Sequence, residues 1–259
     1  IKIAIPSSIG TIFQNLNSIV DAIFAGQMIS TTALAAIGQI FPIYFIIIAM
    51  GVGLSIGTTS LIANNIGKNN LKDATNIFAQ GIFISLLLSI IISFLGINYS
   101  EIIITSINSD LETLIYSLKY LNIIFLGSIF IFILMILNSC LSAQGDTASY
   151  RNVLIFSFFL NIILNPILIS GKLFSIELFT PLGISGIAIA TIISQFIGIF
   201  YLIYKLQKTF IFKIFKLSLL KPKINFIKNI LTQGIPASIG LMMIAVGSYI
   251  LLYFVALFG

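Results

Sequence analysis

The chain has 259 residues, of which 59% are apolar and only 8% are charged. So few charged residues cannot cover the surface of a soluble domain of this size. The sequence has no His, no Trp and one Cys, which excludes a disulfide framework, a zinc site and His-based catalysis. The net charge of +6 does not indicate nucleic-acid binding, because the basic residues lie in gaps between long apolar runs.

Seven apolar segments are long enough to cross a bilayer, which takes about 20 residues of helix. We expect them at 3–26, 34–64, 75–99, 114–143, 152–170, 184–206 and 226–258. Gly, Pro, Asn and charged residues separate them, as in Gly67-Lys68-Asn69-Asn70 and Lys221-Pro222-Lys223. The sequence therefore predicts an all-α polytopic membrane protein.

The basic residues predict the orientation of these spans. Eleven of the thirteen Lys and Arg residues precede the first span or lie in alternate gaps, and only Lys119 and Lys172 lie on the other side. Cytoplasmic loops carry the excess of Lys and Arg, so the N-terminus is expected in the cytoplasm of a cell with an inner or plasma membrane.

The segment from Lys205 to Lys228 allows two interpretations. Its lysines alternate with apolar residues such as Phe210, Phe212 and Phe215, which is typical of a surface helix bound to anionic headgroups. The alternative, which we favour, is a cytoplasmic extension of the sixth span followed by an ordinary loop.

A short repeat indicates a second copy of the fold. Ile5-Pro6-Ser7-Ser8-Ile9-Gly10 returns as Ile235-Pro236-Ala237-Ser238-Ile239-Gly240, and each copy opens an apolar span. The offset equals six spans, so the seventh looks like the first span of a parallel repeat, a layout of secondary transporters. We expect a six-helix lobe at 1–210, a cytoplasmic linker at 211–225 and the first helix of a second lobe at 226–259. The chain is then a fragment of a twelve-helix protein.

Asp21 is the one acid that falls deep in a predicted span. It shares a helical face with other polar or small residues, namely Ser7, Gly10, Gln14, Asn17 and Ser18. A carboxylate at depth costs at least ~2.5–3.5 kcal/mol, so it should face a wet cavity and hold a proton or Na⁺. The alternative is a carboxylate that reaches the outer interface or caps a helix. Pro6 removes a backbone hydrogen bond and is expected to bend this span.

The fifth span carries a second polar stripe of Ser157, Asn161 and Asn165, each four residues apart. Amides there could donate to Asp21 or ligate a cation, or they could simply join helices. The second span is rich in small residues such as Gly51, Gly53 and Gly57, which predicts close helix packing.

Several segments together resemble the multidrug and toxin extrusion (MATE) family of cation-coupled efflux transporters. The matching segments occur in order along the whole chain: Ile5-Pro6 with Asp21, Ala33-Leu34-Ala35-Ala36-Ile37-Gly38, Phe41-Pro42-Ile43, Leu61-Ile62-Ala63 with Gly67, Ala143-Gln144-Gly145-Asp146-Thr147, Asn161 through Pro166, and Gly186-Ile187-Ala188-Ile189-Ala190-Thr191.

The resemblance implies two six-helix lobes around a central cleft that opens alternately to each side. It implies exchange of H⁺ or Na⁺ for organic, often cationic, compounds, with Asp21 as the coupling acid beside Asn161 and Asn165. The remaining polar residues of the expected cavity are Gln14, Asn17, Ser18, Ser157 and Thr191. Some branches of the family carry an acid where this chain has Asn165, so Asp21 would act alone.

These residues predict an antiporter that exports organic compounds, with H⁺ or Na⁺ as the coupling ion, no other cofactor and no metal besides Na⁺ at Asp21. The expected partners are the bilayer and a small organic substrate, and the full-length protein is expected to be a monomer. The alternative function is a flippase for a lipid-linked oligosaccharide or polyprenyl-diphosphate precursor, but a diphosphate would need deep Lys or Arg residues. A membrane enzyme would need clustered His, Cys or paired acids at depth, which the spans lack.

Overall fold

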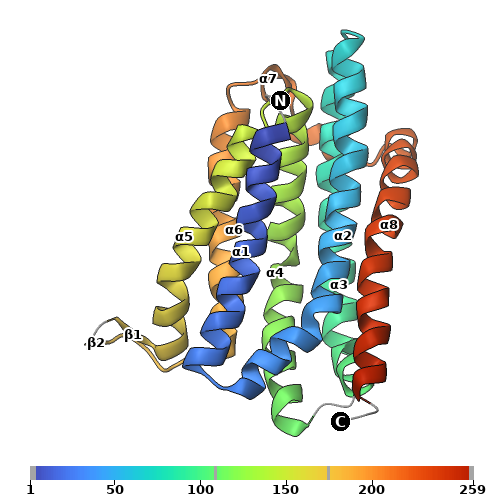
Figure 1. Ribbon diagram of the computed structural model, residues 1–259. Helices are drawn as coiled ribbons and strands as arrows, with labels where there is room; N and C mark the ends of the chain where they lie inside the picture. The colour runs from blue at the N-terminus through green and yellow to red at the C-terminus, as the bar shows by residue number, and fades with distance from the viewer. Residues whose placement is uncertain (1–3, 108–109, 174–175, 257–259) are drawn as a thin grey trace.

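The computed structural model describes residues 4–107, 110–173 and 176–256. Within these residues the chain is a bundle of long helices that run side by side (Figure 1). The helices are α1 (Ala4–Met28), α2 (Thr31–Gly67), α3 (Leu71–Thr105), α4 (Leu111–Ala143), α5 (Ala148–Ser170), α6 (Ile184–Leu206), α7 (Phe210–Ile214), the 3₁₀ helix η1 (Leu217–Leu220) and α8 (Ile224–Ala256). Two short strands, β1 (Lys172–Leu173) and β2 (Ile176–Glu177), join α5 to α6.

Six of the described helices, α2 to α6 and α8, are long and apolar enough to cross a membrane. The first predicted span is the exception, although α1 lies in the bundle beside α5 (Figure 1). Length is not the reason, because α1 has 25 residues whereas α5 and α6 have 23 each. The polar stripe that includes Gln14, Asn17 and Asp21 makes α1 less apolar than the other long helices, so the crossing expected of residues 3–26 stays a prediction.

Polar side chains cap the beginnings of three helices near the predicted breaks, and a glycine ends a fourth. Ser30, Asn70 and Asp110 each accept a hydrogen bond from the backbone N–H three residues on, which caps α2, α3 and α4. Gly171 ends α5 in the left-handed region, with φ of +70°. A side chain at position 171 would also collide with the backbone of Phe179, so the turn requires glycine.

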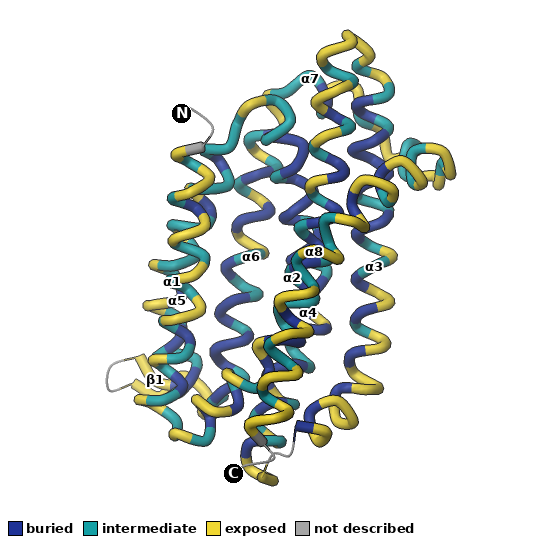
Figure 2. The backbone as a smooth tube through the Cα atoms, turned by 45° about the vertical axis from the view of Figure 1, so that its right-hand side comes forward, coloured by how far each residue is buried: buried dark blue, intermediate teal, exposed yellow. Residues whose placement is uncertain are grey.

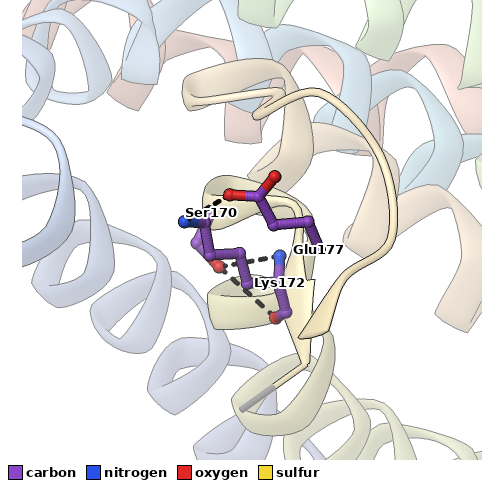
Figure 3. A network of polar contacts seen from close by, with 3 residues as sticks. All are labelled: Ser170, Lys172 and Glu177. Atoms are coloured by element: carbon purple, nitrogen blue, oxygen red, sulfur yellow. Dashed lines mark hydrogen bonds and ion pairs between the residues drawn. The ribbon is translucent and has the colours of Figure 1, made fainter. Parts of the chain in front are cut away.

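A small hairpin that the sequence did not predict follows this turn. Strand β1 pairs antiparallel with β2, and Lys172 lies opposite Glu177. The ammonium of Lys172 and the carboxylate of Glu177 are 2.7 Å apart, and the Ser170 hydroxyl accepts a hydrogen bond from the Lys172 backbone N–H (Figure 3). The ion pair is exposed, so it contributes at most about 1 kcal/mol.

The two ends of the bundle differ in charge. We call them the α7 end, where α1 begins and α6 stops, and the hairpin end, where β1 and β2 lie (Figure 1). Ten basic residues belong to helix termini and connections at the α7 end: Lys68, Lys72, Arg151, Lys205, Lys208, Lys213, Lys216, Lys221, Lys223 and Lys228. This is the end that the sequence predicts to be cytoplasmic.

Helix α4 lies in the middle of the bundle and α8 at one edge (Figure 1). Little of α8 is coloured as buried, in contrast to α4 (Figure 2). Glycines let α8 pack closely on α2. A Cβ at Gly53 would lie 2.6 Å from the Gly234 carbonyl oxygen, and one at Gly57 would lie 2.6 Å from the Ile230 carbonyl oxygen. The predicted role of the small residues of the second span in helix packing is confirmed.

The connection between α6 and α8 is held on α3 by one side chain. The amide nitrogen of Gln80 donates to the carbonyls of Leu219 and Lys221 at 2.8 and 2.9 Å, and its oxygen accepts from the Lys223 backbone N–H at 2.9 Å. We call this arrangement the Gln80 clasp. The expected extension of the sixth span is not formed, because α6 ends at Leu206 and the chain turns into α7.

Candidate functional site

A cavity of about 110 Å³ opens between five helices of the bundle. Its walls combine polar residues with aromatic and aliphatic ones. The polar and aromatic lining residues are Gln14, Asn17, Ser18 and Asp21 of α1, Phe41 and Tyr44 of α2, Tyr120 of α4, Tyr150 and Ser157 of α5, and Thr191 and Gln195 of α6. The polar stripe of α1 therefore faces the cavity, because positions 14, 17, 18 and 21 share one face of a helix.

Asp21 is the only acid in the lining of this cavity. Its side chain is buried, with 5% of its surface exposed. The Asn165 amide nitrogen donates to one carboxylate oxygen at 2.8 Å, and the Thr191 hydroxyl lies 3.4 Å from the other and donates to it. One carboxylate thus joins α1 to α5 and to α6, which argues against the alternative of a carboxylate at the outer interface.

A second group of hydrogen bonds continues from this carboxylate between α5 and α6. The Asn161 amide donates to the Ser157 carbonyl at 2.9 Å and to the Ser194 hydroxyl at 3.3 Å. The Ser157 hydroxyl also donates to the Ser194 hydroxyl at 2.7 Å, and Ser194 donates to the Thr191 carbonyl. Asn161 therefore lies one helical turn from Asn165, the hydrogen-bond partner of Asp21. It is joined to α6 by its hydrogen bond to Ser194.

Several amide oxygens around Asp21 are buried without a hydrogen-bond partner in the described part of the chain. They belong to Asn17, Asn161, Asn165 and Gln195. Leaving such an oxygen unpaired costs about 1–3 kcal/mol, so each needs a partner, which a water molecule or a cation can supply. Carboxylate, amide and hydroxyl oxygens are the ligands that a hard cation prefers. The residues present therefore fit a cation at Asp21.

The cavity includes all of the residues that the sequence predicts for it, namely Gln14, Asn17, Ser18, Ser157 and Thr191. Asn161 and Asn165 are fully buried behind its wall. Pro6 lies far from the site, in the first turn of the described α1, where a missing N–H removes little helical hydrogen bonding. The bend expected at Pro6 stays a prediction.

The sequence analysis missed Ser194 and Gln195 of α6 and three tyrosines of the cavity, Tyr44, Tyr120 and Tyr150. Ser194 and Gln195 follow Thr191 by three and four residues within an apolar helix, so the spacing used for α1 would have found them. The spacing of a tyrosine does not indicate a cavity in this way, because tyrosines of membrane helices are also common at the membrane–water interface.

The sequence is similar to known multidrug transporters. A family model described as MatE matches residues 6–167. The chain is 31% identical over 241 residues to the probable multidrug resistance protein NorM of Thermotoga maritima, covering 92% of this chain and 50% of that protein. It is 25% identical over 257 residues to the multidrug export protein MepA of Staphylococcus aureus, covering 99% of this chain and 55% of MepA. The chain thus spans about half the length of the curated relatives it matches.

The fold is similar to solved transporters in two states. An inward-facing multidrug resistance MATE family transporter of the MOP superfamily superposes with a TM-score of 0.81 and 25% identity, over 96% of this chain and 56% of that one. An outward-facing one superposes with a TM-score of 0.80 and 27% identity, over 93% of this chain and 52% of that one. The bundle, its polar cavity and these matches agree: the chain belongs to the MatE family of membrane transporters.

Proposed function

We propose that the protein containing this chain is an antiporter that couples the entry of H⁺ or Na⁺ to the export of organic compounds. The observation that carries the proposal is the buried carboxylate of Asp21, held between three helices at the wall of a cavity. A carboxylate inside an apolar bundle is costly unless it binds a partner. The coupling ion is that partner. The names of the relatives support the export of drugs.

Ion binding would act on the contacts of α1. The charged Asp21 accepts a hydrogen bond from Asn165 on one oxygen and from Thr191 on the other. A proton turns one of these oxygens into a donor, so one of the two contacts has to change. The hydrogen bond that joins α1 to α5 or to α6 is then altered, and α1 moves relative to the other helices that line the cavity. That shift is the step that exchanges the ion for the substrate.

Sodium is a candidate ion for the same position. The unpartnered amide oxygens of Asn161 and Asn165 lie one helical turn apart, and Asn165 contacts Asp21 directly. A turn of the Asn165 amide would bring its oxygen, in place of its N–H, toward Asp21. With the carboxylate, the Thr191 hydroxyl and Asn161, a Na⁺ would then have four oxygen ligands. Sodium and a proton would therefore compete for one carboxylate.

An organic cation is the substrate class that the cavity favours. Tyr44, Tyr120 and Tyr150 line the same cavity as Asp21. Aromatic faces attract cations, especially where water is excluded. The flippase alternative is less favoured, because the described lining holds no Lys or Arg to pair with a diphosphate.

The basic α7 end supports a bacterial inner or plasma membrane location with the N-terminus in the cytoplasm. We further propose that a second lobe completes the transporter, which works as a monomer. The boundaries at 1–210, 211–225 and 226–259 stay a prediction. In the structure α7 and η1 lie between α6 and α8.

Replacing Asp21 tests the coupling. The variant Asp21→Asn keeps the size of the side chain but carries no charge at any pH. We expect it to abolish gradient-dependent efflux of an organic cation such as ethidium from cells that express the whole protein, while the amount in the membrane stays the same. The matched control is Glu101→Gln, which neutralises an exposed acid near the end of α3 and should transport normally. Undiminished efflux by Asp21→Asn would refute the mechanism.

The ion is identified by counterflow in vesicles of the whole protein. A pH gradient and a Na⁺ gradient are imposed separately, and ethidium uptake is followed for each. Uptake driven by only one gradient names the ion, and uptake driven by neither contradicts ion coupling.

A further inference from the structure

The outer surface of the bundle carries a second hollow, a groove that shares only Val153 with the lining of the polar cavity. It lies between α5 and α6, close to the α7 end, and its volume is about 430 Å³. Three residues of each helix line it: Asn152, Val153 and Phe156 of α5, and Ile197, Gly198 and Tyr201 of α6. The groove therefore runs along the two helices over about one turn, or about 5–6 Å.

The groove is polar at one end and apolar at the other. Asn152 and Tyr201 lie at the end nearer α7, where the Asn152 amide donates to the Tyr201 hydroxyl at 3.4 Å and so bridges the two helices. Phe156 and Ile197 form the other end, with 48% and 39% of their surfaces exposed. This polarity is that of a phospholipid, with a headgroup at the interface and acyl chains below it.

Two cations flank the polar end. The Arg151 guanidinium donates from Nε and Nη2 to the Asn152 amide oxygen at 3.2 and 2.8 Å. The Lys205 ammonium lies 5.4 Å from the centre of the Tyr201 ring. Neither makes an ion pair with a carboxylate of the described residues, where the ion pair found is that of Lys172 with Glu177. Each of the two polar residues of the groove, Asn152 and Tyr201, is thus in contact with a cation that makes no ion pair among the described residues.

We infer that this groove binds one phospholipid with an anionic headgroup from the leaflet at the α7 end. The phosphate lies between Arg151 and Lys205, and an acyl chain lies against Phe156 and Ile197. An Arg side chain binds phosphate oxygens in a bidentate manner, and Lys adds a point charge. A polar contact between α5 and α6, the Asn152–Tyr201 bond, then lies directly under the headgroup.

Two comparisons within the molecule support this occupant. A second outward groove, between α3 and α4, is lined by apolar residues and small polar ones such as Ser93 and Asn98, and no basic residue lines it. The α5–α6 groove also lies across the bundle from α8 (Figure 1), so the packing of α8 on α2 does not cover it. Among the described residues no Lys or Arg lines the α5–α6 groove itself, but two of its lining residues, Asn152 and Tyr201, are in contact with the cations Arg151 and Lys205, and these contacts distinguish it.

The test measures lipid retention by the whole protein in native mass spectrometry, with phosphatidylglycerol and phosphatidylcholine added in equal amounts. We expect the wild type to retain one phosphatidylglycerol in preference to phosphatidylcholine. The double variant Arg151→Gln with Lys205→Gln should lower that preference about tenfold or more, because each interfacial charge attracts anionic lipid. Ile197→Trp, which fills the groove without changing charge, should lower the retention of both lipids.

The matched control is Lys213→Gln with Lys216→Gln, which removes two exposed charges from the same end outside the groove. An equal loss in this control would show that the surface charge acts as a whole and would overturn the site. Equal retention of the two lipids by the wild type would also overturn it, as would unchanged retention by Ile197→Trp.

A measurement on the unaltered protein does not depend on the folding of any variant. Phosphatidylglycerol with a photoreactive acyl chain should crosslink to peptides that contain residues 152–156 and 197–201. Crosslinks confined to the α3–α4 groove, or spread evenly over the bundle, would contradict the proposal.

Discussion

Asp21 owes its position to the residues one and two turns before it. Gln14, Asn17 and Asp21 share one face of α1 and line the cavity, whereas Ile12, Ile19 and Ile23 are exposed on the outside of the bundle. Asn165 and Thr191 then meet the carboxylate from two other helices. Contacts made across 144 and 170 residues of sequence lie in the tertiary packing and not in the local pattern.

The two asparagines of α5 should therefore differ in effect. Asn165→Ala removes the donor that lies 2.8 Å from Asp21, whereas Asn161→Ala removes contacts to Ser157 and Ser194. Losing a hydrogen bond to a charged group costs about 1.5–3 kcal/mol. We expect Asn165→Ala to reduce ion-driven efflux at least tenfold, and Asn161→Ala to reduce it less. The measurement is initial efflux rate at equal membrane expression, and the reverse order would contradict the geometry.

The sequence predicted the members of this site better than their contacts. Residues 14, 17, 18 and 21 follow from helical spacing alone, since one face of one helix decides them. Ser194 and Gln195 could have been found in the same way. The sequence named the amides of the fifth span as possible donors to Asp21, but it did not single out Asn165 over Asn161, because it leaves the rotation of α5 about its own axis undetermined. That rotation is set by packing against α1 and α6.

At the scale of single elements, hydropathy predicted the long helices and failed on the short ones. The helices α2 to α6 and α8 are apolar over at least 18 residues, and a bilayer requires such segments to be helical. The five residues of α7, the turn η1 and the hairpin β1–β2 are too short to show periodicity. Their conformation depends on single contacts such as the Gln80 clasp.

The Gln80 clasp predicts a local stability effect. Gln80→Ala would leave two carbonyls and one N–H of residues 219–223 without their partner, at a cost of about 1–3 kcal/mol. We expect faster tryptic cleavage after Lys223, which Ile224 follows, in vesicles that expose the α7 end. The control is Asn76→Ala, which removes only a contact to the Lys223 side chain and should change cleavage less. Equal cleavage of Gln80→Ala and wild type would contradict the clasp.

At the scale of the whole molecule, the contact between α2 and α8 is the one that the sequence predicted least well. We call this contact, made by Gly53 and Gly57 with residues 230–238, the seam. A high content of glycine predicted close packing of the second span, but it did not name the partner. The structure brings Gly53 and Gly57 against residues 230–238, which lie more than 170 positions later. Small residues permit close approach to any helix, so the choice of α8 depends on the fit of the complete surfaces.

A larger side chain in the contact between α2 and α8 should push the two helices apart. In Gly57→Leu the new Cβ would lie 2.6 Å from the Ile230 carbonyl oxygen, which is backbone and cannot move aside alone. Overpacking of this kind costs about 1–3 kcal/mol. We expect a lower thermal unfolding midpoint for the whole protein in detergent. Gly38→Ala is the matched control on the same helix, because a Cβ there meets no atom within 4 Å. A normal midpoint for Gly57→Leu would show that the seam is loose.

The Gln80 clasp and the α2–α8 seam would limit the movement of the proposed second lobe. Residues 219–223 are fastened to α3, and α8 is seated on α2 as far as Ser238. The connection therefore cannot act as a slack tether between two moving bodies. A large rotation of the proposed second lobe would then have to bend α8 near Pro236, whose missing N–H removes one helical hydrogen bond, and so loosen the packing on α2 around it.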